Sequence, residues 1–385
     1  MKKRMKIIFP ICLLLLFCSC KKSLKLEFTG ITPGVKNGVF LIKTTEDSTV
    51  FGTNIKDGKF ELHNLQLKYQ GYYLMLITNT DSTENRTPFE VYLEPGTYQI
   101  TTELNKLYRY PQITSPSKIQ QQISAYQKLT QQFIDRAFNE SKKQKDELKA
   151  NGSSLKSEDY KTLVNKSVKS DLKLTNISFL ALSDYAKTYP NSDISAHMMA
   201  KMNYTDDPAA YYNLFKTFND AAKNSDDGKE LNNKLSHLVK LVPGAVAPAI
   251  VGKTPDGKIF DQSKITSGVI LVDFWRASND IGRRNHQTMI DFLKTMNDPK
   301  KFTIVSVSID TKVDWWTSAI AQDNITWPQV CDLKGDDSPN AANWSITKIP
   351  TYYLVSKDWK IIDRDIDIQR LDFEVNDYLK HHPNQ

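Results

Sequence analysis

Hydrophobic and polar residues alternate in the first part of the chain, from Leu24 to about Asn105. Short apolar-polar runs recur there, at Val39–Ile42, Lys59–Leu62, Tyr72–Ile77 and Phe89–Leu93. Turn-forming pairs separate the runs, at Asn37-Gly38, Asp57-Gly58 and Pro95-Gly96. Alternation with such turns is typical of antiparallel strands and hairpins. The pattern predicts a small all-β domain, which we assign to residues 20–115.

A helical period replaces this alternation between about Pro116 and Val242. Glycine is almost absent, and apolar residues recur at spacings of three and four between Ile119 and Ile134. The chain is broken by polar turn residues at 151–154 and 190–192. Asp207-Pro208 has the form of a cap followed by a first-turn proline. These features predict an all-α region of four or five helices over residues 116–243.

A third pattern begins after Gly244. Val269–Val272 and Phe302–Val307 are short apolar runs with branched residues, as expected for strands buried on both faces. A segment of helical length lies between them, which favours a right-handed crossover in an α/β sheet. Tyr352–Val355 and Lys360–Asp363 then have the form of a closing hairpin, and a last helix is expected near residues 371–379. We assign this α/β domain to residues 244–385.

The length and the charge of the chain bear on its number of domains and on whether it binds nucleic acid. At 385 residues the chain exceeds one ordinary core, so a multidomain protein is expected. The formal charge is +7, but Lys2, Lys3, Arg4 and Lys6 supply four of those charges, and only +3 remains from Cys20 onward. A nucleic-acid-binding domain needs a clustered basic face. We therefore expect no nucleic-acid partner.

The N-terminus has the features of an export signal over residues 1–19. A basic run precedes the apolar segment Ile7–Phe17, which is too short to span a bilayer as a permanent helix. The segment Leu16-Phe17-Cys18-Ser19-Cys20 resembles a lipobox, in which the last cysteine is lipidated; the alternative is an ordinary cleaved signal with incidental cysteines. Lipidation of Cys20 predicts a cell-envelope lipoprotein, anchored at the outer membrane on its periplasmic or surface side. Cys331 would then be the only thiol.

The α/β domain resembles a known family at several motifs. Val272-Asp273-Phe274-Trp275 runs directly into a turn and helix, Pro248 and Thr254–Lys258 precede it, and Ile349-Pro350-Thr351 precedes the hairpin. This set resembles the TlpA/ResA branch of thiol-disulfide oxidoreductases, which is related to the AhpC/TSA peroxidases. The resemblance implies a thioredoxin-like fold for residues 244–385. The β and helical regions resemble the N-terminal regions of similar lipoproteins, whose role is undefined.

The same resemblance places the redox Cys-x-x-Cys motif on Asn279-Asp280-Ile281-Gly282. In the active family, the first cysteine lies at a helix N-terminus that favours its thiolate, and the second resolves the mixed disulfide. Asparagine offers no such nucleophile, and glycine has no side chain to resolve a disulfide. We therefore predict that Asn279 and Gly282 are vacated catalytic positions and that no catalytic residue remains.

A binding site is predicted around the same loop. Its residues are Trp275, Asn279, Asp280, Ile281, Gly282, Ile349 and Pro350. The resemblance implies a cis peptide at Pro350, which in active relatives leaves backbone groups free to pair with an extended peptide; the alternative is a tight turn kept for packing. Asp273 matches the buried carboxylate of thioredoxins. Arg283 and Arg284 follow the loop and belong either to a solvated helix face or to a site for an acidic group.

Three functions follow from these features. The leading hypothesis is a noncatalytic module that binds an envelope protein or an extended peptide. The first alternative is an oxidoreductase or antioxidant protein that uses Cys331 or a partner's thiol, and the second is a structural envelope component. The six histidines are scattered apart from the pair at the C-terminus, so we expect no metal site, and no motif indicates a cofactor.

Overall fold

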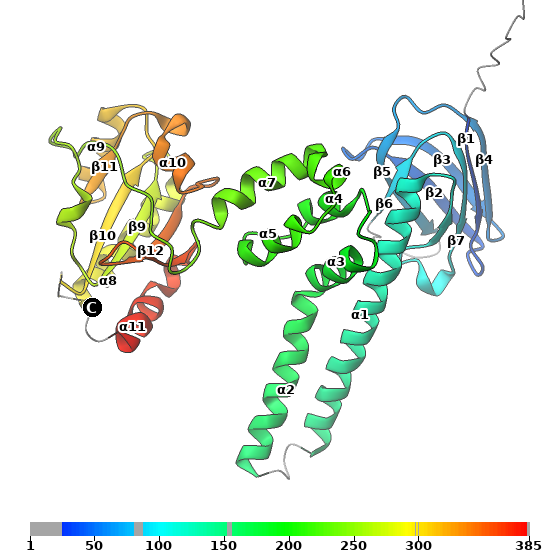
Figure 1. Cartoon of the computed structure of the whole chain (residues 1–385), viewed down its shortest axis with the longest axis horizontal. Coiled ribbons are helices and arrows are strands. Elements are labelled where there is room, and N and C mark those ends of the chain that lie inside the picture. Colours follow the sequence, from blue (N-terminus) through cyan, green and yellow to red (C-terminus); the bar gives the residue numbers. More distant parts are fainter. Residues whose placement is uncertain (1–24, 81–87, 152–155, 297, 299, 383–385) are drawn as a thin grey trace, which may run out of the picture. The chain divides into compact units, whose positions relative to one another are not determined.

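A computed structural model of the chain describes residues 25–80, 88–151, 156–296, 298 and 300–382 (Figure 1). Its contacts divide the chain into two compact units, Met1–Leu174 and Thr175–Gln385. Because this division falls within the helical stretch, the three domain boundaries drawn from the sequence stay predictions. The predicted signal segment and Cys20 lie outside the described residues.

The first unit contains an eight-stranded sheet in the order β6-β5-β2-β3-β4-β1-β7-β8. Only the β1–β7 pair is parallel, and the other neighbouring pairs are antiparallel. The strands are β1 (Leu26–Ile31), β2 (Asn37–Lys43), β3 (Thr49–Lys56), β4 (Lys59–Leu65), β5 (Gly71–Asn79), β6 (Phe89–Leu93), β7 (Gly96–Thr101) and β8 (Gln112–Thr114).

Alternating side chains build the core of this sheet, as the period of two predicts. Phe40 and Ile42 on β2 are fully buried, and the Phe40 ring centroid lies 5.2 Å from that of Phe28 on β1. The predicted turn at Asp57-Gly58 joins β3 to β4, with φ angles of 47° and 74°. The turn predicted at Asn37-Gly38 is wrong, because these residues begin β2 and the chain turns earlier, where Gly34 has a φ of 87°.

Two long helices follow the sheet, α1 (Lys118–Asn151) and α2 (Ser157–Thr175). Figure 1 shows them running alongside each other, and the Ser141 hydroxyl on α1 donates a 2.7 Å hydrogen bond to Asp171 on α2. The first turns of α1 pack against β6 and β8. In the part of the chain that the structure describes, no helix combines the length and the apolar character needed to cross a membrane.

The second unit begins with five shorter helices: α3 (Ile177–Thr188), α4 (Ser195–Ala200), α5 (Pro208–Lys216), α6 (Asp220–Asn224) and α7 (Asp226–Leu238). The prediction of four or five helices for the whole stretch is therefore too low, since seven lie among its described residues. Polar side chains cap the starts of α5, α6 and α7. The capping residues are Asp207, Asn219 and Ser225, and each accepts a hydrogen bond from the backbone N–H three residues further on. The start predicted at Asp207-Pro208 is confirmed.

A five-stranded sheet completes the second unit, in the order β11-β10-β9-β12-β13. Strands β9, β10 and β11 are parallel, while β12 and β13 form the predicted antiparallel hairpin. The strands are β9 (Val269–Trp275), β10 (Phe302–Ser308), β11 (Gln329–Cys331), β12 (Thr351–Ser356) and β13 (Ile361–Arg364). The helices are α8 (Asp280–Met296), α9 (Val313–Gln322), α10 (Pro339–Asn343) and α11 (Leu371–His381).

The central strand β9 is buried at every residue because neighbours flank it on both sides and cores cover both faces. Trp275 points into the core shared with Met289 of α8 and Trp316 of α9. Phe274 points into the opposite core, against the Trp344 ring. The buried strand thus gives a rigid support to the loop that follows it, at the C-terminal end of β9.

Candidate functional site

The loop between β9 and α8 lies beside the start of β12. Antiparallel pairing sets Thr351 of β12 opposite Phe274 of β9. The Ile349–Pro350 peptide bond, directly before Thr351, is cis. The sheet therefore brings the predicted redox loop and the predicted cis-proline loop together, although some 70 residues separate them in sequence.

Asn279 connects these two loops. Its side-chain oxygen accepts the backbone N–H of Gly282 at 2.7 Å, so the amide caps the first turn of α8. Its side-chain nitrogen donates to the carbonyl oxygen of Ile349 at 3.1 Å. Both ends of the carboxamide are thus used within the protein, and neither end is a nucleophile.

Gly282 faces the same point from the helix. A Cβ atom built at this position would lie 3.3 Å from Asn279 Oδ1, 3.6 Å from Pro350 Cβ and 3.9 Å from Trp275 Cβ. The only tight approach is therefore to the capping oxygen of Asn279. Positions 279 and 282 face each other across the first turn of α8, next to the cis-proline.

The other predicted binding residues divide into exposed and buried ones. Asp280 is exposed, Ile281 is 55% exposed, and Ile349 and Pro350 are half-buried. Trp275 is fully buried and packs edge-on against His286. The prediction that Trp275 contacts a ligand is therefore wrong, because its inward position on β9 makes it a support beneath the loop.

A cavity of about 390 Å³ opens beside the loop. Arg276 and Asn279 line it from the loop, and Lys348 and Ile349 line it from the cis-proline segment. The Arg276 guanidinium donates to the carbonyl oxygen of Ile309 at 2.9 Å and pairs with Asp336 at 2.6 Å. The cavity is thus lined by a charged side chain, Arg276, that these two bonds hold in place.

Below the loop, His286 of α8 lies in a buried polar cluster. Its Nδ1 is 2.8 Å from Asp323 Oδ2, and its Nε2 is 3.6 Å from Asp273 Oδ2, which is beyond hydrogen-bond range. Asp273 Oδ2 accepts a 2.6 Å hydrogen bond from Ser306, while its Oδ1 is buried without a partner. Arg283 pairs with Asp323, so it belongs to this cluster and not to a freely solvated helix face.

The cluster favours a positive charge on His286. Burial by itself lowers the pKa of the imidazole, but the carboxylates of Asp273 and Asp323 outweigh it, and the pKa lies above its usual 6.5. Partial burial raises the pKa of Asp323, yet hydrogen bonds from Arg283 and His286 prevail and leave it below the usual value. Sequence reasoning gave Asp273 as a buried carboxylate but missed its grouping with His286 and Asp323. A further available signal was the spacing of Gly282 and His286, which puts them on one face of α8.

Comparison with known proteins found solved structures that are similar to this part of the chain. The thioredoxin domain of a thiol-disulfide oxidoreductase from Bacteroides vulgatus is 30% identical, covering 36% of this chain and 98% of that one, with a TM-score of 0.34. A thiol:disulfide interchange protein from a Bacteroides species is also 30% identical, covering 37% and 90%, with a TM-score of 0.33. Searches with protein-family models and among curated proteins found no match. Through its C-terminal part, the chain belongs to the thioredoxin-like thiol-disulfide oxidoreductase domains.

The thioredoxin-like domain has a single cysteine, Cys331, which lies on β11 and away from the loop in sequence. Its thiol is 2% exposed and lies 3.6 Å from the carbonyl oxygen of Asp310. Burial is the main cause that raises its pKa above the usual value. A buried thiol with a raised pKa forms little thiolate, which is the reactive species. Among the described residues, no group of three His, Cys, Asp or Glu side chains could hold a metal ion.

Proposed function

We propose that this protein is a lipid-anchored envelope protein whose thioredoxin-like domain binds a protein or peptide without thiol-disulfide exchange. The observation that carries the proposal is the position of Asn279, whose carboxamide caps α8 and holds Ile349. These two bonds give the asparagine a role in the loop that needs no thiol. The burial of Cys331 further disfavours an oxidoreductase that works through this residue.

The surface around the loop supports a binding role. Ile281 exposes an apolar side chain at the first turn of α8, and the adjacent cavity offers Arg276 and Lys348. An extended peptide that paired with the carbonyl of Ile349 would have to displace the Asn279 amide. We therefore expect a partner to contact Ile281 and the cavity and to leave the Asn279 bond intact.

Reductase activity is the first test. The purified mature protein, in which Cys20 carries the lipid and Cys331 is the remaining thiol, should reduce insulin no faster than background, because it has no dithiol to carry the electrons. A thioredoxin with an intact Cys-x-x-Cys serves as the positive control. Reduction by the wild-type chain that disappears in Cys331→Ser would reject the proposal in favour of the oxidoreductase alternative.

Photocrosslinking in cells tests binding. A photoreactive amino acid at Ile281 should capture a defined envelope protein or peptide. The matched control is Val246, which is 71% exposed and pairs with Lys360 in the β12–β13 turn, at the end of the sheet opposite the loop. Equal capture at both positions, or none at either, would favour the structural envelope component.

Anchoring through Cys20 needs its own test. Lipoproteins carry a diacylglycerol and an N-acyl chain, which exceeds the two-chain threshold for stable membrane attachment. The wild-type protein should therefore remain with envelope membranes after fractionation, and Cys20→Ala should be released or misprocessed. A wild-type protein found wholly in the soluble fraction would refute the anchor.

A further inference from the structure

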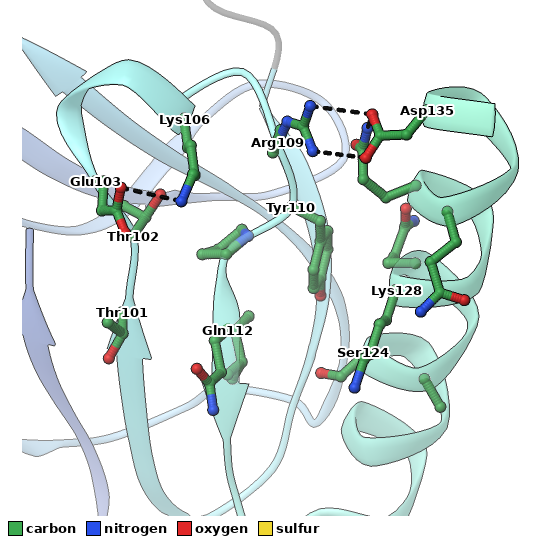
Figure 2. Close-up of a pocket in the computed structure, with 16 residues that line it drawn as sticks. Thr101, Thr102, Glu103, Lys106, Arg109, Tyr110, Gln112, Ser124, Lys128 and Asp135 are labelled. Atoms are coloured by element: carbon green, nitrogen blue, oxygen red, sulfur yellow. Dashed lines mark hydrogen bonds and ion pairs between the residues drawn. The ribbon is translucent and has the colours of Figure 1, made fainter. Parts of the chain in front are cut away.

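A second cavity, of about 610 Å³, lies in the first unit and is independent of the thioredoxin-like domain. Its volume falls within the range of small-molecule sites. One wall is formed by β7 and β8, where Thr101 and Gln112 are paired across the two strands. The opposite wall is one face of α1, with Ser124 and Lys128 one helical turn apart (Figure 2). The cavity is thus built from adjacent segments of a single unit.

Two ion pairs occupy the rim of the cavity. Arg109 donates two hydrogen bonds to Asp135 of α1, at 2.9 and 3.0 Å, and ties the segment before β8 to the helix (Figure 2). Glu103 pairs with Lys106 at 3.0 Å. Both acidic side chains that line the cavity are therefore already matched by cations. Of the three cationic side chains that line the cavity, Lys128 is the one that takes part in neither ion pair.

A buried hydrogen-bond network orients the wall beside Lys128. Gln120 of α1 is fully buried, and its side-chain oxygen accepts the backbone N–H of Tyr92 at 2.9 Å. Its side-chain nitrogen donates to the Tyr110 hydroxyl at 2.9 Å and to the Ser124 hydroxyl at 3.1 Å. Tyr110 in turn donates to the carbonyl oxygen of Glu90. A network satisfied in this way holds its members in fixed positions.

This network leaves Ser124 as a donor toward the cavity. Its oxygen accepts from Gln120, so the hydroxyl hydrogen remains to be donated. Lys128, four residues further on, lies on the same helix face, where such side chains are neighbours. In the part of the chain that the structure describes, neither the Ser124 hydroxyl hydrogen nor the Lys128 ammonium has an acceptor. Two adjacent donors, one of them charged, match a group with two acceptor oxygens and a negative charge.

We propose that this cavity binds a small carboxylate-bearing molecule, with its carboxylate on Ser124 and Lys128. The facing wall offers the hydroxyl of Thr101 and the carboxamide of Gln112, which donate and accept hydrogen bonds. Polar groups that flank a carboxylate, such as the hydroxyls of an acidic sugar or the amides of a peptide C-terminus, would find hydrogen-bond partners on this wall. The carboxylate is the chemistry that these two sources share.

Calorimetry on the full chain in detergent tests this site with four probes. The acids are D-glucuronate and N-acetyl-alanyl-alanine, and their neutral counterparts are D-glucose and N-acetyl-alanyl-alanine amide. At least one acid should bind at least roughly tenfold more tightly than its neutral counterpart, because a charge-assisted hydrogen bond is lost in the neutral probe. The acid that binds more tightly identifies the source as a sugar or a peptide. Binding should weaken as salt is added.

Substitutions locate the site. Lys128→Gln should weaken binding of the acid roughly tenfold, and Ser124→Ala should weaken it by a smaller factor. Lys142→Gln is the matched control, since Lys142 is an exposed lysine of α1 that does not line the cavity. Circular dichroism of each variant should match the wild type, which separates lost binding from lost structure.

Three results would overturn the proposal. The first is no binding of either acid up to about 10 mM. The second is equal affinity for the acids and their neutral counterparts, which would mean that the carboxylate is not recognised. The third is unchanged binding in a folded Lys128→Gln variant, which would place any acid site elsewhere on the chain.

Discussion

Replacement of Asn279 by alanine tests whether its carboxamide stabilises the loop as the geometry indicates. The substitution removes two bonds, one to the N–H of Gly282 and one to the carbonyl of Ile349. Loss of a helix cap costs about 1 kcal/mol, and loss of a hydrogen bond such as the one to Ile349 costs about 1 kcal/mol more. We expect Asn279→Ala to lower the free energy of unfolding by about 2 kcal/mol.

Asn279→Ser is the matched variant. A serine hydroxyl is among the preferred capping groups, but it is too short to replace the amide that reaches Ile349. Only the second bond should therefore be lost, and the expected cost is about 1 kcal/mol. The free energy of unfolding should therefore fall from wild type to Asn279→Ser to Asn279→Ala. The first step measures the bond to Ile349, and the second measures the helix cap.

Urea unfolding followed by tryptophan fluorescence measures this series in the right domain. All six tryptophans lie at or beyond residue 275, so the signal reports the thioredoxin-like domain. With a typical urea slope of about 1–3 kcal/mol per molar, a loss of about 2 kcal/mol moves the midpoint by roughly 1 M. If Asn279→Ala unfolds at the wild-type midpoint, the two bonds do not stabilise the loop. If serine and alanine unfold at the same midpoint, the capping bond is not the source of the stability.

Three further predictions follow from the same domain. Asn279→Cys combined with Gly282→Cys should fold and form an internal disulfide on mild oxidation, because the only tight contact at position 282 is to an atom that the first substitution removes. If both new thiols stay free after oxidation, as counted with a thiol reagent in addition to Cys331, these are not the vacated redox positions. The contribution of His286 to the free energy of unfolding should be fully present below about pH 6.5 and be lost as the pH rises through its raised folded-state pKa. His286→Gln should lose this part of the pH slope in urea titrations, and an unchanged slope would contradict the cluster geometry. Cys331 should react with a thiol reagent slowly until the domain is unfolded, and fast labelling of the native protein would contradict its burial.

The periodic patterns of the sequence predicted much of the local structure. The alternation of apolar and polar residues in the first part of the chain corresponds to β-strands in the structure. The uninterrupted apolar run 269–272 lies in the central strand β9. The cap at Asp207 was readable because aspartate is a preferred N-cap residue and proline is favoured at the first helical position. The helix count was too low, since the caps at Asn219 and Ser225 restart helices only a few residues apart.

The candidate site was predicted in part. The resemblance brought Asn279, Gly282 and Pro350 into one hypothesis, and the structure brings these three residues together. It did not predict that the Asn279 amide joins the two loops, because that bond depends on the register between β9 and β12. It also assigned Trp275 to the binding surface, whereas the strand's alternation turns this side chain into the core.

Sequence alone determined many of the strands and helices, the absence of cysteine at positions 279 and 282, and the resemblance to thioredoxin-like domains, because these depend on near neighbours and on residue type. Tertiary structure alone decided which distant residues meet. His286, Asp273 and Asp323 form one cluster because α8, α9 and β9 share one hydrophobic core. Lys128 and Gln112 line one cavity because α1 packs beside β8. Such contacts between distant residues depend on how the apolar faces of helices and sheets pack against one another. The spacing of apolar residues along one segment does not encode that packing.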